Sequence, residues 1–150
     1  MLVREVLLIG AKDDDMKELK VQALIENLDQ VIAFLDTELE AVECPMKEQM
    51  QLDVAVEEIY VNIASYAYES GTGDALIQVE KLEDPNRIVV TFIDSGIYYN
   101  PLEKEDPDVT LSAEERAIGG LGIYMVKKSM DRMDYERKDD HNILKLTKNI

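Results

Sequence analysis

The sequence is poor in cysteine and histidine, with Cys44 and His141 as the single representatives among 150 residues. One cysteine excludes an intrachain disulfide and suits a reducing compartment. Cys44 and His141 also lie far apart in the chain, so neither a Cys/His zinc cluster nor a Cys–His nucleophile pair is expected. We interpret Cys44 as a small buried residue or a loop residue between helices.

Long apolar runs are also missing. The longest, Val-Leu-Leu-Ile at residues 6–9, is too short for a membrane span of about 20 residues. It is also too short for the apolar core of a signal peptide. We therefore expect a cytoplasmic protein that does not enter a membrane.

Basic residues are half as numerous as acidic ones, 16 against 32, and the formal net charge is −16. Such a surface repels nucleic acid and anionic lipid over most of its area, which argues against a DNA- or RNA-binding role. A phosphate-bearing ligand would need a local device to hold it, such as backbone amides, a helix N-terminus or a metal ion.

The apolar pattern predicts one domain over residues 16–150, preceded by an extension over residues 1–15 that ends in three aspartates. From Met16, Leu19 and Val21 alternate with polar residues as in a half-buried strand. The other expected elements are helices over 26–43 and about 47–69, strands over 75–82 and 88–93, a long loop over 101–117 with a helical turn at 112–116, a helix over about 121–133, and a hairpin of strands 133–137 and 142–148. This order predicts an α/β fold of the α+β two-layer sandwich type. Its sheet is expected to be mixed, mostly antiparallel, with helices on one face.

The second expected helix carries a polar strip at the edge of its apolar face. On a helical wheel, Glu58 and Asn62 stack on each other, with the apolar residues Val54 and Val61 beyond them. The apolar face itself comprises Leu52, Ala55, Val56, Ile59, Ile63, Tyr66 and Ala67. A polar strip between two apolar sectors is typical of the wall of a cleft. A solvated helix edge is the alternative, although an Asn is a poor helix-interior residue without a ligand.

Two glycine-containing segments follow. The strand over residues 88–93 ends in Asp94-Ser95-Gly96, where the carboxylate could accept a hydrogen bond from the amino group of a base and Gly96 would let a ring approach the backbone. The alternative is an ordinary turn. Gly119, Gly120 and Gly122 surround Leu121 just before the third expected helix. Their backbone N–H groups could converge on phosphate oxygens, or the segment could be a loop hinge. Neither a Gly-Lys-Ser/Thr phosphate loop nor a dinucleotide-binding fingerprint is present.

In combination, these segments resemble the GHKL (gyrase, chaperone, histidine kinase, MutL) superfamily of ATP-binding domains. Residues 58–62 are similar to its N box, residues 94–96 to its first glycine box and residues 119–122 to its second. The resemblance implies an ATP site in which Asn62 coordinates Mg²⁺, Glu58 is the general base and Asp94 binds the adenine amino group beside Gly96. It also implies that Gly119, Gly120, Leu121 and Gly122 line the phosphates and that residues 101–118 form a lid.

The short length and a final strand over residues 142–148 resemble those of the bacterial anti-sigma-factor serine kinases. The resemblance implies a homodimer that binds a sigma factor or similar regulator and phosphorylates a serine of a small STAS-type antagonist protein. The chain departs from the family pattern at Tyr66, where a histidine is usual, and at Tyr98, where a small residue is common. Lys104 and Arg116 are the lid candidates for contacting the γ-phosphate. The alternative function is a non-catalytic, ATP-dependent binding and signalling module.

Overall fold

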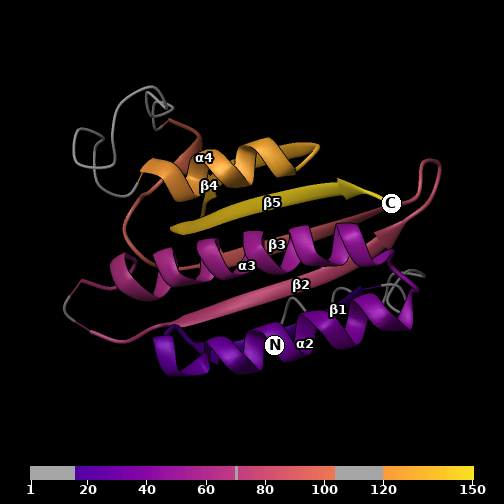
Figure 1. Cartoon of the computed structure of the whole chain (residues 1–150). Coiled ribbons are helices and arrows are strands. Elements are labelled where there is room, and N and C mark those ends of the chain that lie inside the picture. The colour runs from indigo at the N-terminus through magenta and orange to yellow at the C-terminus, as the bar shows by residue number, and fades with distance from the viewer. Residues whose placement is uncertain (1–15, 70, 104–119) are drawn as a thin grey trace.

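The computed structural model describes residues 16–69, 71–103 and 120–150, which form a five-stranded sheet and three α-helices (Figure 1). The strands are β1 (Met16–Gln22), β2 (Asp74–Leu82), β3 (Arg87–Asp94), β4 (Arg132–Lys138) and β5 (His141–Asn149). The α-helices are α2 (Leu28–Ala41), α3 (Met46–Tyr66) and α4 (Gly120–Ser129), with 3-10 helices η2 (Ile25–Asn27) and η3 (Pro101–Glu103). The expected extension over 1–15, the helical turn at 112–116, and the candidates Gly119, Lys104 and Arg116 lie outside the described residues.

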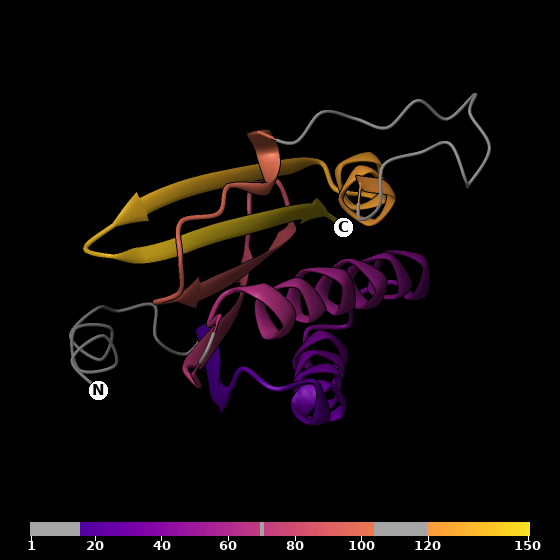
Figure 2. The ribbon, with the colours of Figure 1, turned by 90° about the vertical axis from the view of Figure 1, so that its left-hand side faces the viewer.

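The sheet has the strand order β1-β2-β3-β5-β4, and each pair of neighbouring strands is antiparallel. All three helices lie on one face of it (Figure 2). The predicted α+β two-layer sandwich is therefore confirmed, with a sheet that is antiparallel throughout the described residues. Because β3 pairs with β5, Asp94 lies directly opposite Asn142.

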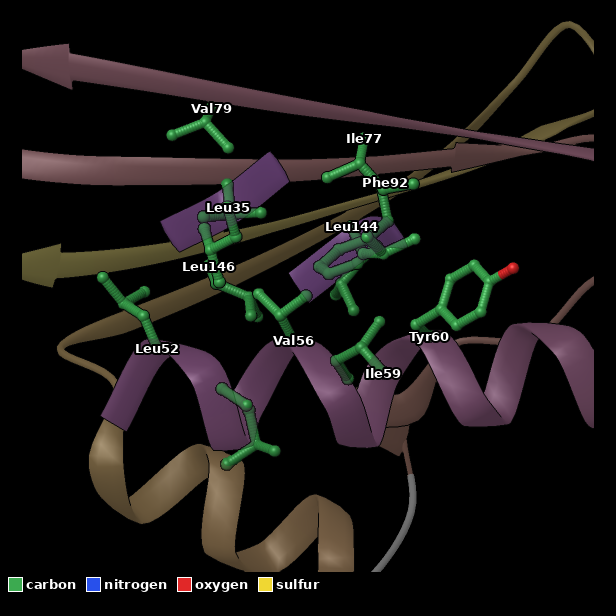
Figure 3. Close-up of a cluster of buried hydrophobic side chains, with 14 of the residues drawn as sticks. Leu35, Leu52, Val56, Ile59, Tyr60, Ile77, Val79, Phe92, Leu144 and Leu146 are labelled. Carbon is green, nitrogen blue, oxygen red and sulfur yellow. The ribbon is translucent and has the colours of Figure 1, made fainter. Parts of the chain in front are cut away.

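Helix α3 crosses the middle of the sheet and supplies much of the core. Its side chains Leu52, Val56 and Ile59 point toward the strands, where they meet residues such as Phe92 and Leu144 (Figure 3). These apolar side chains are almost completely removed from water, each worth about 1.5–3 kcal/mol of hydrophobic stabilisation. The face of α3 that the sequence predicted to be buried is thus largely the face that packs on the sheet.

The helical wheel placed Tyr66 in the buried face of α3 and did not include Tyr60. Tyr60 is fully buried, whereas Tyr66, predicted to lie in the core, is 66% exposed. The hydroxyl of Tyr60 accepts the N–H of Leu24 at 3.1 Å and lies 2.7 Å from the Leu24 carbonyl oxygen, to which it can donate. The prediction was wrong because the wheel considered only packing on the sheet, while α2 and its preceding turn also cover the side of α3 that carries Tyr60.

Helix α4 is shorter than predicted, ending at Ser129 instead of Met133. The N–H of Met130 still bonds to Val126, but the N–H of Asp131 donates to Thr147 of β5 at 2.9 Å. The helix therefore ends where the backbone begins to hydrogen-bond to β5, before another helical turn can form. Among the helices that the structure describes, none has the length and hydrophobicity needed to cross a membrane.

A carboxyl pair lies where α2 faces α3. Burial, followed by a hydrogen bond with Asp36 and by the charges of Asp36 and Glu40, raises the pKa of Asp53 to about 7. Gln49 donates to Oδ1 of Asp36 at 3.2 Å, while Oδ1 of Asp53 is buried without a partner among the described residues. At pH 7 about half of the molecules therefore carry a proton on Asp53, and this shared proton offsets the repulsion between the two carboxylates.

This pair predicts a pH dependence of stability that Asp53→Asn removes. Because the folded-state pKa is raised from 3.8 to about 7, the pair stabilises the fold most below pH 3.8, and this contribution is lost as the pH rises toward 7. The asparagine amide can donate to Asp36 at any pH. We therefore expect the variant to be more stable than the parent at pH 8, by about 1–2 kcal/mol, with the difference shrinking toward pH 4.

Urea unfolding at several pH values measures this difference. Glu57→Gln, at an exposed position of the same helix, is the matched control and should show no such trend. An equal effect of Asp53→Asn at pH 5 and pH 8 would contradict the shared proton.

Candidate functional site

A pocket enclosing about 100 Å³ lies where the C-terminal half of α3 meets the ends of β3 and β5. Most of its wall is apolar or aromatic, and Asn62, Asp94 and Asn142 are its polar members. Its other lining residues are Ile59, Ile63, Tyr66, Ala67, Phe92, Ile97, Tyr98, Tyr99, Pro101, Ile123, Tyr135 and Leu144. An apolar pocket with a few convergent polar groups is the usual form of a small-molecule site.

The structure brings together several of the residues that the sequence singled out. Asn62 and Asp94 line this pocket. Glu58, one turn before Asn62, lies against Gly122 so closely that a methyl group added at Gly122 would overlap the carboxylate. Gly120 and Leu121 begin α4, so the predicted phosphate segment leads directly into the first turn of that helix. The first-turn N–H groups of an α-helix lack intrahelical acceptors and can bind an anion.

Asp94 is the buried acidic residue of the pocket, with 6% of its surface exposed. It ends β3, and its Oδ1 accepts two hydrogen bonds, from the N–H of Gly96 at 2.8 Å and from Nδ2 of Asn142 at 3.0 Å. Within the described residues, no hydrogen bond reaches Oδ2. The carboxylate is thus fixed by one oxygen and presents the other as an acceptor for a ligand.

Gly96 has a packing role that the sequence did not indicate. Its φ is not in the left-handed region, and it packs against Ala67 at the end of α3. The N–H of Ile97 donates to the Ala67 carbonyl at 2.9 Å, and Arg137 donates to the Gly96 carbonyl at 2.9 Å. The absent side chain therefore lets the turn after β3 approach the end of α3, and the hypothesis that it also lets a ligand ring approach the backbone stays a prediction.

Four tyrosines line the pocket. Tyr98 contacts Tyr135 edge-on, with ring centroids 5.8 Å apart, and donates a hydrogen bond to Glu103 at 2.8 Å. Burial raises the pKa of Tyr99, and the nearby charges of Glu58 and Tyr66 raise it further. The two positions where the chain departs from the family pattern, Tyr66 and Tyr98, therefore both belong to the pocket wall.

Sequence analysis missed Asn142 and Tyr135 as site residues. Asn142 is 6% exposed and occupies an inward-facing position of β5 that Leu144 and Leu146 share. A polar residue in an apolar alternation was the available signal for Asn142. For Tyr135 no local signal existed, because its hydroxyl reaches the site through the β4–β5 pairing.

Comparisons with known proteins identify the family and support the fold. Residues 21–148 match the family model of the histidine kinase-like ATPase domain. The chain is 27% identical over 96 residues to the serine/threonine-protein kinase BtrW of Bordetella bronchiseptica, covering 64% of this chain and 67% of BtrW. The crystal structure of the RsbU and RsbW domains of Rv1364c from Mycobacterium tuberculosis superposes with a TM-score of 0.61 at 14% identity. That likeness covers 89% of this chain but 32% of the mycobacterial one, and it concerns the fold alone.

The contact between Gly96 and Ala67 predicts that Gly96→Ala destabilises the protein. The added methyl group would overlap the Ala67 carbonyl, a backbone group that cannot move without breaking its hydrogen bond to Ile97. We expect a loss of about 1–3 kcal/mol, measured by urea unfolding. Gly71→Ala is the matched control, because nothing lies within 4 Å of a methyl group there. Equal stability of the two variants would contradict the close approach.

Proposed function

Because the chain belongs to the histidine kinase-like ATPase domain family, we propose that it is an ATP-binding serine-protein kinase of the anti-sigma-factor type. Membership of this family implies an ATPase- or kinase-like domain that binds ATP. The serine substrate and the regulatory role go beyond what the family implies and belong to the proposal. The observation that carries it is the buried carboxylate of Asp94 in a mostly apolar pocket that Asn62 also lines. We assign this activity to residues 16–150, with residues 1–15 as an extension.

In this proposal the pocket binds the adenine ring. The free Oδ2 of Asp94 accepts a hydrogen bond from the exocyclic amino group, and the apolar and aromatic wall around it removes the ring from water. The phosphates then lie toward Gly120, Leu121 and Gly122 at the start of α4, where first-turn N–H groups have no intrahelical acceptor and would donate to phosphate oxygens. Such main-chain donors can hold a polyphosphate despite the net charge of −16.

The proposed Mg²⁺ ion fits the donor that α3 offers. Asn62 presents an amide oxygen, a hard ligand suited to this cation. No group of three His, Cys, Asp or Glu side chains in the described parts of the chain is arranged to hold a metal ion. In the proposal Asn62 is therefore a single protein ligand to an ion that keeps water and phosphate oxygens. Bound there, Mg²⁺ would neutralise phosphate charge during transfer.

Glu58 is the proposed general base. Its carboxylate lies against Gly122, at the helix end where the terminal phosphate is expected. Glu58 would accept the proton of the serine hydroxyl as the serine oxygen bonds to the γ-phosphorus. The bond from that phosphorus to the β–γ bridging oxygen breaks, and ADP leaves. Phosphoryl transfer depends mainly on positioning and charge neutralisation, so this small set of groups is sufficient.

The partners belong to the proposal as well. BtrW, the relative described above, is a serine/threonine-protein kinase by name, which supports a protein substrate. We propose a STAS-type antagonist protein as the phosphoacceptor, a sigma factor or similar regulator as the sequestered partner, and a homodimer as the working unit. The acidic surface would favour basic faces on these partners through electrostatic steering.

A second candidate function is a non-catalytic module in which ATP acts as a conformational ligand. Tyr66 and Tyr98, the two departures from the family pattern, both line the pocket and favour this alternative. Under it, Asp94 and the glycines still bind nucleotide, but Glu58 is dispensable.

We predict Mg²⁺-dependent ATP binding that Asp94→Asn and Asn62→Ala weaken. Asp94→Asn removes the charged acceptor for the amino group, and on the order of a tenfold to hundredfold loss of affinity is expected. Asn62→Ala should chiefly reduce the Mg²⁺ dependence. Isothermal titration calorimetry at fixed free Mg²⁺ measures both effects, with Glu57→Gln on the solvent side of α3 as control. A folded wild-type protein that binds no ATP would refute the nucleotide site.

Phosphoryl transfer separates the two candidate functions. With labelled ATP and a STAS-type partner, Glu58→Gln should retain ATP binding but lose transfer by at least about a hundredfold, as for loss of a general base. Gly122→Ala should act in the same direction, because its methyl group would push the Glu58 carboxylate aside. A partner with alanine in place of its acceptor serine is the negative control. Unchanged transfer in Glu58→Gln would rule out this residue as the base, and no transfer by the wild type would favour the non-catalytic module.

A further inference from the structure

The side-chain amide of Asn142 uses its full hydrogen-bonding capacity. Its Nδ2 donates to Oδ1 of Asp94 at 3.0 Å and to the carbonyl of Ile97 at 2.8 Å. Its Oδ1 accepts the N–H of Tyr99 at 3.2 Å and the hydroxyl of Tyr135 at 2.5 Å. An asparagine amide has two N–H donors and one oxygen with two lone pairs, so all four places are filled.

These partners fix which way the amide faces. The N–H of Tyr99 can only donate and the carbonyl of Ile97 can only accept, so exchanging the amide oxygen and nitrogen would oppose like groups at both positions. The Tyr135 hydroxyl completes the arrangement from β4. Asn142 therefore always turns an N–H toward Asp94.

The direction of this N–H determines which oxygen of Asp94 remains available to a ligand. Together with the N–H of Gly96, it engages Oδ1 of Asp94, a residue that lines the pocket, and leaves Oδ2 as an acceptor without a hydrogen bond from the described residues. An acceptor there matches a purine with an amino group at its 6 position and opposes a purine with an oxygen at that position.

We propose that Asn142, oriented by Tyr135 and by the backbone of the loop from Ile97 to Tyr99, is a positioning residue that makes the site select 6-amino over 6-oxo purine nucleotides by fixing Asp94 as an acceptor. This inference rests on the proposed ATP site and adds the residue that sets its base selectivity. Asn142 acts through Asp94 and does not need to touch the base.

Asn142→Asp replaces the N–H donor at this position with a carboxyl oxygen at nearly constant side-chain volume. The new carboxyl group would face two acceptors, the Asp94 carboxylate and the Ile97 carbonyl, so the two acidic groups would retain a proton between them. As the pH falls, a second proton could bind Oδ2 of Asp94 and be donated to a 6-oxo group. Selectivity should fall, and it should fall further at lower pH.

The test compares Kd values for ATP and ITP, which differ at the 6 position, by calorimetry between pH 6 and pH 8. The wild type should prefer ATP at every pH. Asn142→Asp should lower the ATP/ITP preference on the order of tenfold, with ITP affinity rising toward pH 6. Asn149→Asp is the matched control, because it makes the same substitution at an exposed position of β5 opposite Arg87, outside the pocket lining. It should keep the wild-type ratio.

Tyr135→Phe tests the same inference independently should Asn142→Asp not fold, as judged by circular dichroism. Losing the hydroxyl frees one lone pair of Asn142, and about a threefold drop in the ATP/ITP ratio is expected. A folded Asn142→Asp protein, or a folded Tyr135→Phe protein in its place, that retains the wild-type ratio at all pH values would overturn the inference while leaving the ATP site intact. A wild-type protein that binds neither nucleotide would instead overturn the proposed function.

Discussion

The burial of one face of α3 against the sheet is the constraint on which the site depends. Packing of Leu52, Val56 and Ile59 onto the strands fixes the rotation of the helix about its axis (Figure 3). Because Glu58 and Asn62 are at a set angle from that face, their direction is determined by the core. The same rotation brings the end of α3 to the turn after β3. The packing that forms the core therefore also forms the wall of the pocket.

The end of α3 and the end of β3 then behave as one structural unit. The carbonyl of Ala67 accepts the N–H of Ile97. One residue further on, the hydroxyl of Tyr68 accepts the N–H of Ser95 at 2.8 Å and donates to the carbonyl of Asp74 at 2.7 Å. These bonds connect the helix with two strands around Asp94. A preorganised acceptor of this kind reduces the ordering that a ligand must impose on binding.

Much of the fold could be predicted from the sequence because its signals are local. Alternation of polar and apolar residues located the strands, and the 3.6-residue period located α2 and α3. The mistakes arose where a partner distant in sequence decides the outcome. Tyr60 is buried because the connection between β1 and α2 receives its hydroxyl, and α4 stops early because Thr147 accepts the N–H of Asp131. A single-sequence pattern contains neither contact.

The residues of the candidate site also fall into two groups, those that local motifs predicted and those that depend on contacts distant in sequence. Glu58, Asn62, Asp94 and Gly122 belong to short motifs, and the structure places them around one pocket and the helix end beside it. Their chemical roles remain predictions. Asn142 and Tyr135 could not be assigned in advance, because their importance arises from strand pairing across the sheet.

The tyrosine-rich wall gives the protein a natural optical signal. The chain contains no tryptophan and seven tyrosines, of which Tyr66, Tyr98, Tyr99 and Tyr135 line the pocket. Tyrosine fluorescence is therefore free of the tryptophan emission that normally masks it, and more than half of the emitting rings face the same cavity. Occupancy of the pocket can be followed in the unmodified protein, without a label and without a substitution that would disturb the site.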